Sequence, residues 1–254
     1  QIVTRGLRAD RNTPIRRLSP VSYYRLSGYM VPVRQSDSTG KRLEEFVPGT
    51  TLDEVWQRYN FDRRLRILLI DAIERIEVAV RTRLVHHFVQ ENDAFGHLQE
   101  KNLPGFKKRS FVKRIIRNLK SLAKLKGLKS TDHQRWLAAL KEEQRRSTEQ
   151  FAKHFRYHYG DNHDQFPLWM ACELMTCGST LQLLNAVDRL IVKQVASDFG
   201  FPDQQLLSWT KALFALRNSC AHHSRIWNRV FGVKPSVPGK NKNPKWHAQP
   251  TFDN

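Results

Sequence analysis

The sequence has few cysteines and few acidic residues, and the cysteine usage already excludes two classes of protein. The three cysteines, Cys172, Cys177 and Cys220, are odd in number and show no paired Cys-x-x-Cys spacing. This pattern argues against a disulfide framework and against a structural zinc site. We expect the cysteines to fill buried helix faces as small apolar side chains, in a protein of the reducing cytoplasm.

Long apolar runs and phosphate-binding loops are also missing. Ile67–Ile70 is typical of the longest apolar runs, which are far too short to span a membrane, and no signal peptide is expected from the polar first residues. Without a Gly-rich loop or a carboxylate pair, a small-molecule enzyme is disfavoured, and no cofactor or metal is expected. A hydrophobic fraction of 40% and a charged fraction of 26% are typical of a chain that folds.

The scarcity of acidic residues leaves a formal net charge of +19, from 43 Lys and Arg against 24 Asp and Glu. A surface this positive favours polyanionic partners, above all nucleic acid. Residues 101–130 contain 11 Lys or Arg and no acidic residue. We expect a phosphate-tracking face there, although a merely solvated face is the alternative, and the pattern does not choose RNA over DNA. The predicted RNA-binding residues are Lys107, Lys108, Arg109, Lys113, Arg114, Arg117, Lys120 and Lys124.

Helical periodicity dominates the chain and predicts an all-α fold. Thr51 and Glu54 form a capping box, and a long amphipathic helix follows from Asp62 to about Gln90. Further helices are expected over 110–127, 132–159 and 167–175, with two more between 179 and 198 and a last one from Asp203 to about Asn228. Residues 33–49 are expected to form a small hairpin or loop. The predicted division is an N-terminal segment 1–50, a helical domain 51–232 that includes the basic helix 110–127, and a basic Pro/Gly/Lys-rich tail 233–254.

An Arg-x4-His pattern occurs twice, at Arg81–His86 and at Arg217–His222. The second copy has an amide, Asn218, directly after the arginine and small residues before the histidine. At about 100° per residue, Asn218, His222 and Arg225 would share an outward helix face. RNA cleavage needs a group that moves protons near neutral pH and a cation for the phosphorane charge. His222 and Arg217 are therefore the candidate catalytic residues, with Asn218 positioning Arg217 or the phosphate.

Four segments together resemble the Abi-like (AbiD/AbiF) family of abortive-infection proteins, from about Ser22 to Asn228. They are Ser22–Tyr29, Phe61–Arg66 with Asp71–Val78, Phe166–Trp169 and Leu216–Asn228. The resemblance implies a HEPN-type helical bundle with an additional N-terminal helical region, a role in phage defence and an R-x4-6-H ribonuclease site. It transfers Arg217, Asn218 and His222 as the motif and adds His223, Arg225 and Asn228 as signature residues that could support it.

The resemblance also implies partners. HEPN sites are generally composite, which implies a homodimer through the motif helix, and some relatives are associated with a small non-coding RNA. Two functions therefore stay open: a metal-independent endoribonuclease, and a non-catalytic protein that holds a dedicated non-coding RNA. A basic DNA-binding regulator is a further alternative, although no recognition helix is visible.

Overall fold

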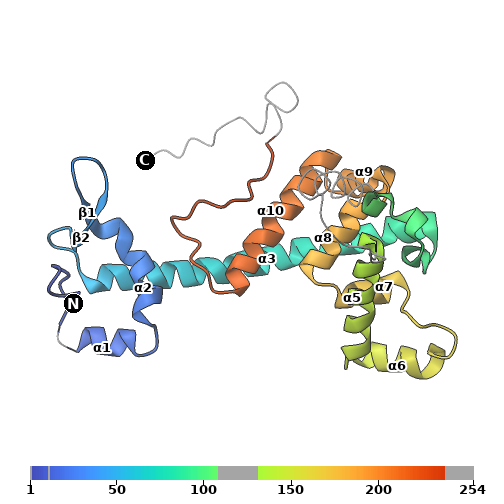
Figure 1. Ribbon diagram of the computed structural model, residues 1–254, viewed down its shortest axis with the longest axis horizontal. Coiled ribbons are helices and arrows are strands. Elements are labelled where there is room, and N and C mark those ends of the chain that lie inside the picture. Colours follow the sequence, from blue (N-terminus) through green and yellow to red (C-terminus); the bar gives the residue numbers. More distant parts are fainter. Residues whose placement is uncertain (1, 11, 108–130, 238–254) are drawn as a thin grey trace, which may run out of the picture. The chain divides into compact units, whose positions relative to one another are not determined.

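The computed structural model describes residues 2–10, 12–107 and 131–237. Helices dominate this part of the chain, with one two-stranded sheet, so the all-α prediction is confirmed (Figure 1). The α-helices are α1 (Thr13–Leu18), α2 (Tyr23–Met30), α3 (Leu52–Asn92), α5 (Asp132–Arg146), α6 (Gln150–Tyr159), α7 (Leu168–Ala171), α8 (Cys177–Ala186), α9 (Arg189–Asp198) and α10 (Asp203–Ala221). The strands are β1 (Arg34–Ser36) and β2 (Arg42–Phe46), and short 3-10 helices are η1 (Val31–Val33), η2 (Gly96–Leu98), η3 (Glu100–Asn102) and η4 (Cys172–Leu174).

The chain forms two compact units. Unit 1 comprises Gln1–Ala72 and Arg217–Val230, and unit 2 comprises Ile73–Leu216 and Phe231–Asn254. Contacts define these units, whereas the boundaries expected at residues 50 and 232 rest on sequence patterns and stay a prediction.

Unit 1 is built around a small apolar core that packs α2, the hairpin and the first turns of α3. Leu26, Tyr29 and Met30 of α2 meet Leu52 and Val55 of α3 in this core. The expected capping box is confirmed, because the Glu54 N–H donates to Thr51 Oγ1 (3.2 Å) and the Thr51 N–H donates to Glu54 Oε2 (3.4 Å). The expected hairpin is present as an antiparallel pair of β1 and β2.

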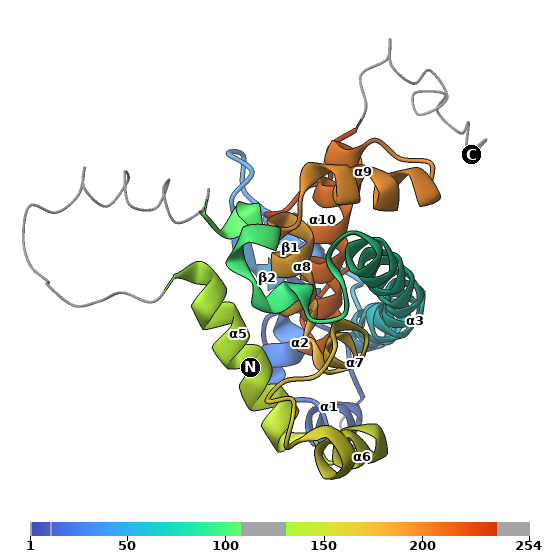
Figure 2. The same cartoon turned by 90° about the vertical axis from the view of Figure 1, so that its right-hand side faces the viewer.

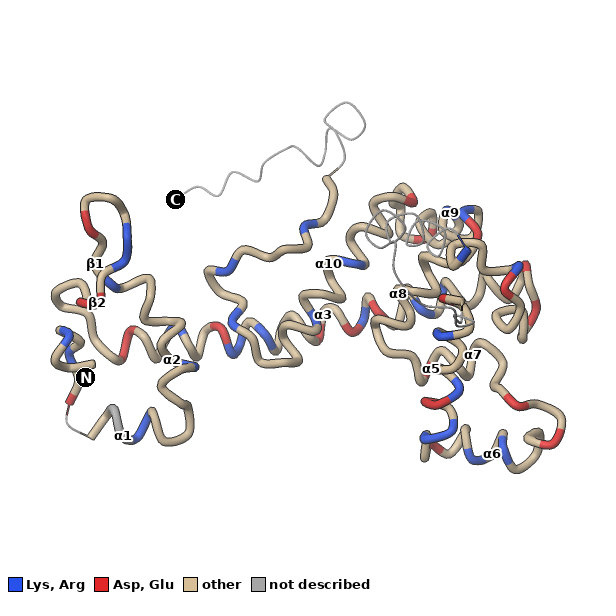
Figure 3. The backbone as a smooth tube through the Cα atoms, viewed as in Figure 1, with Lys and Arg blue, Asp and Glu red and all other residues tan. Residues whose placement is uncertain are grey.

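In unit 2 the remaining part of α3 provides one wall of a larger core. Val80, Leu84 and Phe88 are buried there, as their four-residue spacing predicts, but Ile76, which has the same spacing from Val80, is 38% exposed. Basic and acidic residues are interspersed along this 41-residue helix from Asp53 to Arg83 (Figure 3). All three cysteines are buried, as predicted, and none of them is in a disulfide. The Cys177 thiol donates to Glu77 Oε2 (2.9 Å), so this cysteine is more than an apolar filler.

The single helix predicted over 132–159 is wrong, because the chain leaves the helical conformation after Arg146. Ser147 adopts an extended conformation at the end of α5, and α6 starts afresh at Gln150 and runs in a different direction (Figure 2). Ser147 competes with the helix for backbone hydrogen bonds. The Arg156 guanidinium of α6 then donates to the carbonyl oxygens of Gln144 (2.7 Å) and Ser147 (2.8 Å), which satisfies the open end of α5.

His97 is a buried imidazole in unit 2, and burial, followed by the neighbouring His133, lowers its pKa to about 4. The unfolded chain, with a histidine pKa of about 6.5, binds the proton more readily, so stability is lost as pH falls below that value. Between about pH 7.5 and pH 5, we predict that the unfolding free energy of the wild type falls by about 2 kcal/mol more than that of His97→Gln. Urea titrations of both proteins at the two pH values measure this; an equal fall in both contradicts it.

Candidate functional site

Helix α10 ends in a Schellman motif formed by the histidines of the candidate site. The Ser224 N–H donates to the Ser219 carbonyl (2.9 Å), and the His223 N–H donates to the Cys220 carbonyl (2.9 Å). His223 occupies the left-handed position of the motif, with φ of 56°, where glycine is the usual residue. His222 therefore lies at the last helical turn, where the chain changes direction.

The helix predicted to reach about Asn228 is therefore too long, since α10 ends at Ala221. A continuing helix would give the N–H groups of Ile226 and Trp227 to carbonyls one turn earlier. Instead both donate to the buried carboxylate of Asp62, at 3.0 and 2.6 Å from Oδ1. Arg225 consequently does not share a helix face with Asn218 and His222, and that expectation is wrong.

The three motif side chains lie close together in sequence at this helix end. Asn218 and His222 are exposed, and Arg217 is half-buried. Arg217 Nη1 donates to Asn218 Oδ1 (3.4 Å), which leaves the amide N–H groups of Asn218 to act as donors. Within the described part of the chain, the His222 imidazole makes no hydrogen bond, ion pair or ring contact. The signature residue Asn228 is also exposed and has a positive φ of 50°.

Asp62 is the centre of unit 1's hydrogen bonding and was missed by the sequence analysis. Besides the two backbone N–H groups, its carboxylate accepts from the Tyr29 hydroxyl (2.5 Å, to Oδ2) and forms an ion pair with Arg66. The Asp62 side chain is fully buried. One carboxylate thus ties together α2, α3 and the loop after α10, which are three of the segments that carried the family resemblance.

Two further arginines clamp α2 to the same loop. Arg25 Nη1 donates to the His223 carbonyl (2.8 Å), and Arg225 Nη1 donates to the Gly28 carbonyl (2.5 Å). Arg225 is half-buried and engaged in this contact, so its observed role is to hold the loop. These two reciprocal bonds fix the backbone on both sides of Ser224.

Arg66 does not belong to the exposed charged surface of α3 on which its neighbours Arg63 and Arg64 lie. Only Arg63 and Arg64 are exposed; Arg66 is 5% exposed and pairs with Asp62. Burial, together with the hydrogen bond to Asp62, raises the pKa of Tyr29 to about 12, so its hydroxyl keeps the proton that it donates. The four-residue spacing of Asp62 and Arg66 indicates an ion pair, but not that the pair is buried.

The competing Arg81–His86 copy of the pattern has a structural explanation. Arg81 Nη2 pairs with Glu77 (2.7 Å) and also donates to the Met175 carbonyl (3.3 Å), and Glu77 accepts from the Cys177 thiol (2.9 Å). The Arg81 side chain is only 13% exposed. The arginine of this copy is therefore committed to holding unit 2 together.

Most residues of the predicted basic surface belong to the part of the chain outside the described ranges. Lys107 is exposed in a helical segment that starts at Pro104. Lys108, Arg109, Lys113, Arg114, Arg117, Lys120 and Lys124, with the helix expected over 110–127, lie outside the described residues. In the ranges that the structure describes, no group of three or more His, Cys, Asp or Glu could hold a metal ion. No helix in those ranges combines the length and the apolar composition that a membrane span requires.

Comparison with known families matches the chain to the model for Abi-like protein over residues 16–228. The chain belongs to the Abi-like protein family. The match covers the Asp62 hub and the whole Arg217–Asn228 segment, and membership suggests a role in abortive infection. No curated protein and no solved structure matches the chain.

The left-handed histidine of this Abi-like protein gives a prediction for stability. A residue with a side chain is less stable in this conformation than glycine by about 1–2 kcal/mol. Part of this advantage of glycine is offset, because glycine has greater conformational freedom in the unfolded chain. We expect His223→Gly to raise the unfolding free energy by about 0.5–1 kcal/mol. His154→Gly is the control. His154 is an exposed histidine inside α6, and glycine in a helix interior should lower the unfolding free energy. Thermal melts compare the two variants, and a loss of stability for His223→Gly contradicts the prediction.

Proposed function

We propose that this Abi-like protein is an RNA-binding, metal-independent endoribonuclease of the HEPN type, with His222 as acid or base and Arg217 stabilising phosphate. The exposed imidazole of His222 carries the proposal. His222 lies at the end of α10, where His223 adopts the left-handed conformation and the following loop is anchored by buried hydrogen bonds to Asp62. The imidazole itself has no partner within the described chain. A rigid backbone that presents an unengaged polar side chain is typical of a functional site.

The chemistry requires imidazole groups and a guanidinium, and the Arg217–His222 motif supplies one of each per chain. The 2′-hydroxyl of RNA attacks the adjacent phosphorus and loses its proton to a base, while the bond to the 5′-oxygen breaks and that oxygen gains a proton from an acid. An imidazole can serve in either role near neutral pH. The Arg217 guanidinium would hydrogen bond the non-bridging oxygens as negative charge develops, and Asn218, which accepts from Arg217, would hold it in place.

A homodimer follows from the same chemistry. One imidazole cannot be both base and acid in a single cleavage step, and His222 is the motif's single catalytic histidine. A second copy meeting the first through the exposed Asn218 and His222 side would supply the other imidazole. Sedimentation velocity is expected to show a dimer.

The charge of the chain supports RNA as the partner, with the cytoplasm as the expected compartment. The 11 Lys or Arg residues in 101–130, without an acidic residue, would bind phosphates and release counterions. The same charge favours the second candidate function, a protein that holds a dedicated small non-coding RNA without cutting it. Nucleic acid of one defined length, intact after purification, would favour this second function.

The proposal is tested by incubating the purified wild-type protein with total RNA and following RNA length on denaturing gels. Progressive shortening is expected for the wild type but not for His222→Ala. Equal RNA integrity with both proteins would remove the enzymatic part of the proposal. If the protein still retained RNA tightly in that case, only the RNA-binding function would remain.

A further inference from the structure

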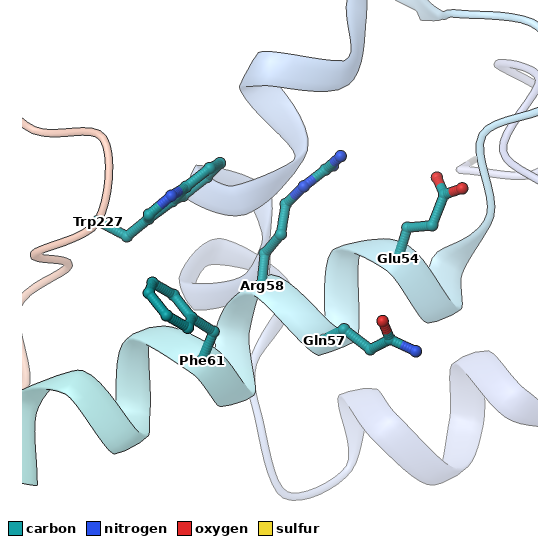
Figure 4. Close-up of a pocket in the computed structure, with 5 residues that line it drawn as sticks. All are labelled: Glu54, Gln57, Arg58, Phe61 and Trp227. Carbon is teal, nitrogen blue, oxygen red and sulfur yellow. The ribbon is translucent and has the colours of Figure 1, made fainter. Parts of the chain in front are cut away.

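A surface pocket in unit 1 lies beside the Asp62 hub and is not used by the proposed chemistry. Its volume is about 420 Å³, and its lining is Glu54, Gln57, Arg58, Phe61 and Trp227. Four of these residues come from the first turns of α3, and Trp227 comes from the loop after α10 (Figure 4). The pocket therefore joins α3 to the loop that begins at His222, directly after the end of α10.

Contacts with Asp62 and with the apolar core of unit 1 hold Trp227 in the aromatic side of the pocket. The backbone N–H of Trp227 donates to Asp62 Oδ1. The Trp227 indole packs against the apolar core of unit 1 and also lines the pocket. Phe61, directly before Asp62, is 52% exposed. An exposed aromatic ring next to a backbone-anchored indole is a platform on which a flat ligand can stack.

The polar side of the pocket indicates what kind of flat ligand fits. Arg58 lies over the Trp227 ring, 6.0 Å from its centroid, and its Nη1 atom is buried with no hydrogen-bond partner in the described chain. Gln57 offers both a donor and an acceptor. Glu54 places a carboxylate at the rim, which disfavours a phosphate but can accept from an amino group. Stacking surfaces with mixed donors and acceptors fit a neutral heterocycle better than an anion or an aliphatic chain.

We propose that this pocket binds one unpaired nucleobase of the RNA, stacked on Trp227 and Phe61, with Arg58 and Gln57 meeting its polar edge. This assignment rests on the proposed function, because the RNA would have to reach the loop that carries His222. Trp227 follows His222 by five residues in the sequence. A base bound here would select single-stranded RNA, since a paired base cannot leave its stack without cost.

The test uses the full chain with His222→Ala in every protein, so that RNA is bound and not cut. Fluorescence anisotropy measures the Kd for a fluorescein-labelled, mixed-sequence single-stranded RNA. Trp227→Ala is expected to weaken binding by about fivefold to a hundredfold, the range for loss of one base–aromatic stack, and Trp227→Phe should retain most of it. Phe61→Ala removes an exposed ring that leaves the core intact, so it tests the pocket even if Trp227→Ala misfolds. Trp169→Ala, at a 49% exposed tryptophan of unit 2, is the matched control.

The salt dependence of binding separates stacking from phosphate contact. Loss of a stacked base should leave the slope of log Kd against log salt unchanged, whereas loss of a phosphate contact makes it shallower. Unchanged Kd for both Phe61→Ala and Trp227→Ala, or a shallower slope with either, overturns the nucleobase pocket. If these variants bind as the parent does while the wild type still cuts RNA, only the pocket is wrong. If the parent binds no RNA, the proposed function fails as well.

Discussion

His222→Ala is expected to lower the rate of RNA cleavage by about a hundredfold to ten-thousandfold, which is the usual contribution of a general acid or base. The fold should be unaffected, because the imidazole is exposed and makes no contact in the described chain. Rates are measured on a labelled single-stranded RNA under single-turnover conditions, with circular dichroism to check folding.

His86→Ala is the matched control for this prediction. His86 is also exposed and also ends an Arg-x4-His pattern, but the arginine of that copy is ion-paired with Glu77. We therefore expect wild-type cleavage from His86→Ala. Loss of activity in His86→Ala with full activity in His222→Ala would contradict the prediction and assign the chemistry to the Arg81–His86 copy.

Asp62→Ala is expected to cost about 3–5 kcal/mol of unfolding free energy, the range for breaking a buried ion pair from one side. It leaves Arg66 buried without its counter-charge and frees the N–H groups of Ile226 and Trp227 along with the Tyr29 hydroxyl. Urea denaturation followed by circular dichroism measures the loss.

Asp53→Ala provides the comparison on the same helix. Asp53 pairs with Arg17, but its side chain is 64% exposed, so its removal should cost no more than about 1 kcal/mol. Asp62→Asn keeps the shape and part of the hydrogen bonding, and it should fall between the two. Similar costs for Asp62→Ala and Asp53→Ala would mean that the Asp62 network does not hold unit 1 together.

Helical periodicity predicted the main elements well, because an amphipathic stripe reports directly which face is buried. The start of α10 after Pro202 and the Thr51 capping box depend on local chemistry and were both predictable. The break at Ser147 and the end of α10 were not. Both depend on side-chain hydrogen bonds with another segment of the chain. Arg156 of α6 donates to the Ser147 carbonyl in the first case, and Asp62 of α3 accepts from the Ile226 N–H in the second.

The candidate site shows the same limit. A local pattern was enough to select Arg217, Asn218 and His222, and the segments around Tyr29, Asp62 and Ile226 were sufficient for the family. Their relation was hidden, since burial of a charged pair such as Asp62 and Arg66 depends on what the rest of the chain packs over it. For the same reason Arg225 was assigned to an outward face, although it binds the Gly28 carbonyl.

The central claim is that His222 and Arg217 cleave RNA through its own 2′-hydroxyl. The most direct measurement is the identity of the product ends when the wild-type protein cuts a defined RNA in the presence of EDTA. We expect 2′,3′-cyclic phosphate and 5′-hydroxyl ends, and no cleavage where the nucleotide before the cut is 2′-deoxy. Products with 5′-phosphate ends, or equal cleavage of the 2′-deoxy substrate, would contradict it.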